Sequence, residues 1–204
     1  MNKKLLIVAM LFGVVLVSNA QEQGKFRVGL DIGYTIPKGG GGVMFDIEPK
    51  YNIADNMNVG IRVTSAAMAK EIEASGGSAE AKLSSTVSYL GTYDYYFHSG
   101  SGSFAPYLGA GLGYYGLGNF EFDSDTAFDG AELDVDGKFG GMIRGGFELG
   151  KFRLGVEYNI IPKTDLGSSY DDGMGNSVTT SGEIKNSYFG ISLGFYLGGG
   201  KWGK

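Results

Sequence analysis

Cysteine is absent from this chain of 204 residues, and histidine occurs once, as His98. Without cysteine there are no disulfides, thiolate metal ligands, cysteine nucleophiles or lipid anchors attached to cysteine. The single histidine leaves little material for histidine-based catalysis. Only 4 residues are proline and no Gly-x-y repeat runs through the chain, so a collagen-like rod is excluded despite 37 glycines.

An excess of positive charge is also lacking, because 17 basic residues stand against 22 acidic ones and the formal net charge is −5. This balance argues against a nucleic-acid-binding protein. After residue 20 there is no run of about 18 apolar residues, so no transmembrane helix is predicted. The chain does contain 43% hydrophobic and 13% aromatic residues, too much apolar surface for a disordered chain.

Residues 1–20 have the organisation of a secretory signal peptide. Lysines near the start are followed by an apolar run over residues 5–17 and then by small residues that end at Ala20. The apolar run is shorter than the ~20 residues of a membrane-spanning helix. We therefore expect cleavage between Ala20 and Gln21 rather than an N-terminal anchor. Residues 21–204 then form one exported domain, which is either soluble or inserted in a membrane as a barrel.

Apolar and polar residues alternate with a period of two in eight segments, the pattern of strands that bury one face. These segments are 26–36, 43–53, 59–67, 83–97, 104–118, 139–147, 152–160 and 189–197. They run 9–15 residues, whereas strands of soluble proteins average ~5–6 and tilted membrane-spanning strands need about 9–11. The sequence therefore predicts an all-β fold, an eight-stranded antiparallel up-and-down transmembrane β-barrel.

The connections between these segments alternate in length. Those at 54–57, 98–103 and 149–151 are short, those at 70–81, 119–138 and 163–185 are long and polar, and only the first, 38–42, is short where a long loop is expected. Outer-membrane barrels have short periplasmic turns and longer extracellular loops. The pattern predicts a barrel in the outer membrane of a Gram-negative-type cell, with both termini periplasmic.

Aromatic residues on the apolar faces gather at the two ends of the segments. Phe26, Tyr51, Phe97, Phe104, Phe147, Phe152 and Phe195 lie near the short turns, and Tyr34, Phe45, Tyr114, Phe139 and Phe189 lie near the long loops. Two aromatic rings around an aliphatic belt are typical of the two membrane interfaces of a barrel. The alternative is the core of a soluble sandwich, in which another layer would have to cover this face.

The opposite faces carry charged residues that would line the barrel interior. The candidates are the carboxylates Asp31, Asp46, Glu48, Asp94, Glu148 and Glu157 and the cations Arg27, Lys50, Arg62, Arg144 and Arg153. An eight-stranded barrel is just wide enough for side chains to fill, and unpaired charge in a dry interior costs several kcal/mol per ion. A paired, hydrogen-bonded plug is the favoured interpretation, and the alternative is a lining that selects ions along a pathway.

Glycine is concentrated on the same inward faces, at Gly29, Gly33, Gly60, Gly109, Gly111, Gly113, Gly146, Gly155, Gly190 and Gly194. Glycine in an ordinary strand interior weakens it, but it also allows another group to approach the backbone closely. In a tightly curved wall we expect these glycines to relieve crowding beside large inward side chains.

Three further features are weaker candidates. The loop at 119–137 holds seven acidic residues and no basic one, and its opening residues lack the third ligand and the glycine of a calcium loop. We interpret it as a solvated surface loop, with weak divalent-cation bridging to lipopolysaccharide phosphates as the alternative. The glycines at 39–42 have no following Lys-Ser/Thr or helix that a phosphate loop requires, so they are expected to form a hairpin tip. His98 falls at a short turn with no second histidine, and no catalytic residue, metal site or cofactor is predicted.

The fifth segment and the repeated Gly-x-Gly pattern with tyrosine carry a family resemblance. The run is Pro106-Tyr107-Leu108-Gly109-Ala110-Gly111-Leu112-Gly113-Tyr114. Together with the signal peptide and the eight strands, it resembles the small outer-membrane β-barrel proteins of the outer-membrane-protein-A/X-like or "porin family" type. The resemblance implies the fold of these proteins rather than a particular role. From the barrel and its long connections we expect a structural or surface-interaction role with loops displayed outside, and no enzymatic activity, because no second histidine accompanies His98.

The alternatives to that role are a narrow channel for small or hydrophobic solutes and, more remotely, a lipid-modifying enzyme. The partners we expect are outer-membrane lipid, lipopolysaccharide and an extracellular ligand of the loops. No nucleic-acid partner is expected, and the barrel is expected to be a monomer.

Overall fold

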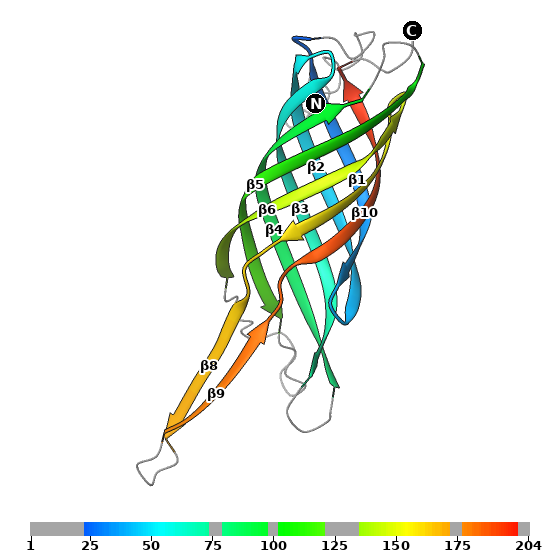
Figure 1. The fold of residues 1–204 in the computed structure, drawn as a ribbon. Coiled ribbons are helices and arrows are strands. Elements are labelled where there is room, and N and C mark those ends of the chain that lie inside the picture. The colour runs from blue at the N-terminus through cyan, green and yellow to red at the C-terminus, as the bar shows by residue number, and fades with distance from the viewer. Residues whose placement is uncertain (1–22, 74–78, 98–101, 121–134, 172–176, 200–204) are drawn as a thin grey trace, which may run out of the picture.

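Eight strands close into a single antiparallel barrel in the order β1-β10-β7-β6-β5-β4-β3-β2 (Figure 1). The structure is a computed structural model that describes residues 23–73, 79–97, 102–120, 135–171 and 177–199. The barrel strands are β1 (Phe26–Pro37), β2 (Gly40–Ala54), β3 (Met57–Glu73), β4 (Ala79–Tyr96), β5 (Phe104–Phe120), β6 (Val135–Leu149), β7 (Phe152–Ile160) and β10 (Tyr188–Gly198). The predicted eight-stranded up-and-down barrel is confirmed. No helix in the described ranges is long and apolar enough to cross a membrane.

Successive side chains of each strand point to opposite sides of the wall, because the side-chain period of a strand is two. The apolar members face outward, where Ile32 and Leu112 are 66% and 65% exposed, and the charged members face inward and are buried. Neighbouring strands continue the outward pattern, since Ile32 pairs with Leu193 and Leu193 pairs with Leu154. A continuous apolar belt therefore surrounds the barrel.

Aromatic side chains border this belt at both ends of the wall. Near the short turns, the rings of Phe26 and Tyr51 lie 5.0 Å apart and those of Phe104 and Phe147 lie 5.2 Å apart. Near the opposite end the ring pairs are Tyr114 with Phe139, at 5.7 Å, and Tyr158 with Phe189, at 4.5 Å. Tilted and edge-on ring pairs at these separations are favourable packing arrangements, and the two rings are placed as membrane-interface girdles are.

We call the end of the barrel with the short β2–β3, β4–β5 and β6–β7 connections the turn end, and the opposite end the loop end. β1 starts and β10 finishes at the turn end, because Arg27 pairs with Gly198. The β6–β7 connection is the pair Gly150-Lys151, in which Gly150 has a φ of 64°. A side chain at that φ would be strained, so glycine makes this tight turn possible.

The connection at 163–185, predicted as a polar loop, contains a second sheet instead. β8 (Thr164–Asp171) and β9 (Ser177–Ile184) pair along their whole length and project beyond the loop end (Figure 1). This segment lacks the alternation of apolar and polar residues that predicts the barrel strands, so β8 and β9 were not predicted. The connection at 70–81 is also mostly strand, because β3 extends to Glu73 and β4 begins at Ala79.

The first connection is shorter than the predicted hairpin tip at 38–42. Only Lys38 and Gly39 form the turn, and Gly39 has a φ of 74°. Gly40 and Gly42 belong to β2, where they pair with Lys70 and Met68 of β3. Because β3 extends far enough to pair with these glycines, they belong to the barrel wall and not to the turn.

Candidate functional site

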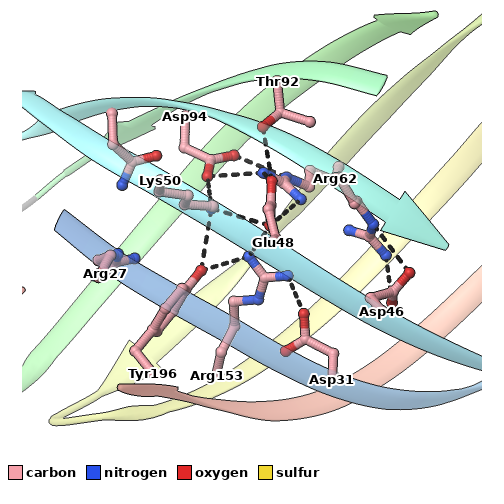
Figure 2. A network of polar contacts seen from close by, with 12 residues as sticks. Arg27, Asp31, Asp46, Glu48, Lys50, Arg62, Thr92, Asp94, Arg153 and Tyr196 are labelled. Carbon is pink, nitrogen blue, oxygen red and sulfur yellow. Dashed lines mark hydrogen bonds and ion pairs between the residues drawn. The ribbon is translucent and has the colours of Figure 1, made fainter. Parts of the chain in front are cut away.

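All eleven charged residues predicted to line the interior lie inside the barrel, each at most 4% exposed. We call this group the interior charge network: Arg27, Asp31, Asp46, Glu48, Lys50, Arg62, Asp94, Arg144, Glu148, Arg153 and Glu157. They come from six strands, and Figure 2 shows most of them converging around Glu48. The structure places the whole set inside the barrel, in ion-paired groups that follow one another along the barrel axis.

The part nearest the turn end joins Arg27 of β1 to Glu148 of β6. The guanidinium donates two hydrogen bonds to the carboxylate, of which Nη1 to Oε2 measures 3.0 Å. Tyr96 closes a triangle, because its hydroxyl accepts a bond of 2.6 Å from Arg27 and donates one of 2.7 Å to Glu148. The Arg27 guanidinium carbon also lies 3.5 Å from the ring centroid of Tyr196, a cation–π contact.

Glu48 of β2 occupies the centre of the network. Arg144 donates to both of its carboxylate oxygens, at 2.6 and 3.0 Å, and Arg153 donates to Oε2 at 3.2 Å. Lys50 forms an ion pair at 3.3 Å, and the Thr92 hydroxyl donates a hydrogen bond of 2.7 Å (Figure 2). A buried carboxylate is tolerated when cations and hydrogen bonds satisfy its lone pairs in this way.

Asp94 and Asp31 extend the centre to either side. Arg144 donates hydrogen bonds from Nε and Nη2 to the Asp94 carboxylate at 2.8 and 2.9 Å, a bidentate geometry that only arginine offers. Lys50 forms an ion pair with the same carboxylate. On the other side, Arg153 pairs with Asp31 and donates a bond of 2.5 Å to the hydroxyl of Tyr196.

Nearer the loop end, Arg62 of β3 joins two carboxylates. It contacts Asp46 with Nε and Nη2 at 3.1 and 2.6 Å, and Glu157 with Nη2 at 2.5 Å. Glu157 also accepts a bond of 2.8 Å from Asn159, whose side-chain oxygen accepts one of 2.9 Å from Tyr115. A chain of charged and neutral groups thus continues from the network into the next layer.

Several of these bonds cross the lumen rather than following the wall. In the ring order β2-β1-β10-β7-β6, Glu48 on β2 and Arg144 on β6 stand on opposite sides. Arg62 on β3 and Glu157 on β7 are likewise opposite, and Arg27 and Glu148 are separated by two intervening strands. Because opposite walls are joined at hydrogen-bonding distance at successive heights, side chains fill this part of the interior.

Above the charge network, toward the loop end, the interior becomes apolar. This layer consists of Met44, Ala66, Met68, Leu90, Tyr115, Leu117, Met142, Ile161 and Tyr188, all at most 5% exposed. Methionine fills irregular gaps because its side chain is unbranched and flexible. The interior is therefore built from a charged layer and an apolar layer stacked along the axis.

The inward glycines provide space for the charged side chains. A Cβ on Gly155 would lie 2.7 Å from the hydroxyl of Tyr107, and one on Gly29 would lie 2.9 Å from the ring of Tyr196. Cβ atoms on Gly194 and Gly109 would collide with Asp31 and Asp94. These glycines relieve crowding beside large inward side chains, as predicted.

Three tyrosines of the interior were not identified from the sequence. Tyr96, Tyr107 and Tyr196 are at most 2% exposed and contact Arg27 or Arg153 through hydrogen bonds or cation–π contacts. Each follows an outward residue in an alternating segment, so strict application of the period would have placed them inside. They were not predicted because only charged residues were considered as candidates for the interior.

His98, the signal cleavage position at Ala20 and Gln21 and most of the acidic loop 119–137 lie outside the described residues. Within the described ranges, no three acidic or histidine side chains are grouped so that they could hold a metal ion.

No protein-family model and no curated protein matches the chain. Solved structures share its fold. Outer membrane protein OprG from Pseudomonas aeruginosa superposes with a TM-score of 0.56 at 16% identity, over 88% of this chain and 98% of that one. Neisserial surface protein A gives 0.52 at 19%, over 86% and 99%. Outer membrane protein AlkL, determined in lipid bilayers, gives 0.51 at 18%, over 89% and 92%. The chain therefore has the fold of small eight-stranded outer-membrane β-barrels.

Proposed function

We propose that this chain is a structural and surface-interaction protein of the outer membrane, a closed monomeric barrel that displays its longer connections outside the cell. Its partners are the surrounding lipid and lipopolysaccharide, together with an extracellular ligand of the loops. The proposal includes no catalytic activity. Both chain ends of the barrel face the periplasm in this orientation, because short turns are periplasmic in barrels of this type.

The ion pairs across the lumen support the proposal that the barrel is closed. Glu48 and Arg144 on opposite walls approach to 2.6 Å, and Arg62 and Glu157 approach to 2.5 Å. An ion that passed through would have to separate these pairs, and separating a buried pair costs about 3–5 kcal/mol. Such a barrier favours a stable membrane anchor over a channel.

The outer surface supports the membrane location. An aliphatic belt bordered by two aromatic rings fits a bilayer core with its two interfaces. In water the same belt would be a large exposed apolar patch, which soluble monomers rarely tolerate. Outer-membrane fractionation and heat-modifiable migration on gels test this part. A mature chain that stays soluble without detergent would contradict it.

Planar-bilayer conductance of the refolded protein tests the closed interior. The wild type is expected to show no stable openings. The double variant Glu48→Ser, Arg144→Ser removes only the central crossing and is expected to stay closed as well, because the crossing between Arg62 and Glu157 and the apolar layer remain. Stable wild-type openings that disappear in Gly155→Trp, but persist in the control Gly137→Trp, would establish the channel alternative instead. Gly155 lies against Tyr107 inside, whereas nothing lies within 4 Å of a Cβ on Gly137.

Protease shaving of intact cells tests the display of the loops. Cleavage between residues 163 and 185, or between 119 and 138, is expected from outside, with the turns at 54–57 and 149–151 protected. Cleavage of those turns in intact cells would contradict the proposed orientation.

A further inference from the structure

A cavity of about 470 Å³ opens at the loop end of the wall, where β10 begins between β1 and β7. Three lysines line it, Lys38 after β1, Lys163 after β7 and Lys185 before β10, and all three are exposed. Among the lining residues that the structure describes, none is acidic. This concentration of positive charge contrasts with the formal net charge of −5 of the whole chain.

The same cavity has an apolar side that faces the membrane. Ile36 and Phe189 contribute to its lining, and they are outward residues that are 43% and 51% exposed. Tyr158 also lines it, and its ring lies 4.5 Å from that of Phe189. Phe189 and Tyr158 belong to the aromatic ring at the loop end, and Ile36 lies opposite Phe189 on the neighbouring strand. The cavity therefore combines a basic rim with an apolar wall at the depth of a membrane interface.

Hydrogen bonds hold the frame of the cavity in place without a ligand. The Ser187 hydroxyl accepts a bond of 3.0 Å from the Ile161 amide and donates one of 3.1 Å to its carbonyl. The side-chain amide of Asn186, which is 4% exposed, donates to the Pro162 carbonyl at 2.8 Å and to the Thr164 hydroxyl at 2.9 Å. These bonds tie the segment that carries Lys163 to the one that carries Lys185. The backbone positions of Lys163 and Lys185 are thus held relative to each other, which lowers the entropic cost of binding.

We propose that this cavity binds the phosphorylated headgroup of a membrane glycolipid, with the three lysines at the phosphates and the acyl chains along Ile36 and Phe189. Lysine is a point donor of positive charge suited to phosphate. A free phosphate would use the basic rim alone, whereas a lipid also covers the outward apolar wall. The inference rests on the proposed function, since it requires the loop end to face a leaflet that contains such lipids.

The test uses the mature chain refolded into phosphatidylcholine nanodiscs that contain a trace of lipid A with both phosphates. Retained lipid A is measured by native mass spectrometry. Each lysine near an anionic lipid surface contributes about five-fold in affinity. Replacing Lys38, Lys163 and Lys185 by Gln is therefore expected to weaken retention about 100-fold. The control replaces Lys25, Lys138 and Lys151 by Gln, which removes the same charge elsewhere, and is expected to change retention less than about two-fold.

Dephosphorylated lipid A is expected to bind the wild type as weakly as lipid A binds the triple variant of the cavity. Equal losses in both triple variants, or undiminished binding of the dephosphorylated lipid, would overturn the proposal. Displacement of lipid A by equimolar inorganic phosphate would also overturn it, because the site would then be one for free anions. Heat-modifiable migration of every variant reports folding. If the wild type fails to insert, the proposed function fails; if it inserts and retains no lipid A, the cavity proposal alone fails.

Discussion

The ion pair between Arg27 and Glu148 offers the sharpest test of a dry, closed interior. It lies at the turn end of the network, and its main partners are each other and Tyr96. Arg27 is 2% exposed and Glu148 is fully buried. Removal of one partner leaves the other charge without its counterion in a place that water does not reach. Arg27→Met and Glu148→Leu are each expected to destabilise the barrel by about 3–5 kcal/mol.

The double variant Arg27→Met, Glu148→Leu should cost much less than the sum of the two single changes. Buried ion pairs replaced by apolar residues of similar volume are often neutral in stability. The remaining loss comes from Tyr96, whose hydroxyl would lose its bonds with Arg27 and Glu148, and from Tyr196, whose ring would lose its cation–π contact with Arg27. That loss is about 1–2 kcal/mol. The expected coupling energy between the two substitutions is therefore roughly 4 kcal/mol or more. This exceeds the usual range for contacting residues, about 0.5–3 kcal/mol.

The measurement is urea unfolding of the refolded barrel in lipid vesicles, followed by the shift between folded and unfolded bands on gels. Each variant is compared at its midpoint and slope, so that stability is separated from changes in compactness. Single changes that cost less than about 1 kcal/mol would mean that water screens the pair. Additive effects would mean the same. Either result would refute the dry interior and revive the channel interpretation.

Two further predictions concern the wall. Gly194→Ala places a Cβ 2.5 Å from the Asp31 carboxyl carbon and is expected to destabilise by about 1–3 kcal/mol in the same urea assay, whereas Gly137→Ala, in open space, should change stability by less than about 0.5 kcal/mol. Leu193→Arg at mid-belt should cost about 2–4 kcal/mol in vesicles, against about 0–1 for Leu149→Arg at the turn end; equal costs would contradict the proposed membrane position.

The alternation of residue types was enough to predict the number and order of the barrel strands and the inward direction of their charged side chains. It succeeded because one face of every strand meets lipid or water and the other meets the interior, which imposes a period of two over long stretches. It failed where no such contrast exists. β8 and β9 extend beyond the barrel, and their sequence lacks the apolar alternation that marks the other strands.

The partners inside the barrel could not be predicted from the same pattern. Arg144 stands directly beside Glu157 on the neighbouring strand, and Glu148 stands beside Arg153. If each charge paired with its direct neighbour in the wall, Arg144 would bind Glu157 and Glu148 would bind Arg153. Instead Arg144 binds Glu48, Glu157 binds Arg62 and Glu148 binds Arg27. The choice depends on the closure of the ring and on the stagger of its strands, which no single segment encodes.

One pair of neighbours shows why closure and charge pairing are coupled. Asp31 and Asp46 stand directly opposite each other on β1 and β2, where like charges are destabilising. An isolated hairpin of these two strands would keep that repulsion. In the closed barrel Asp31 pairs with Arg153 from β7, and Asp46 pairs with Arg62 from β3. The repulsion is relieved only when β10, with β7 as its next neighbour, has joined β1 on one side and β3 has joined β2 on the other. Asp31 and Asp46 thus disfavour the partial sheet and favour the closed barrel. In the closed barrel the same two residues fill part of the interior.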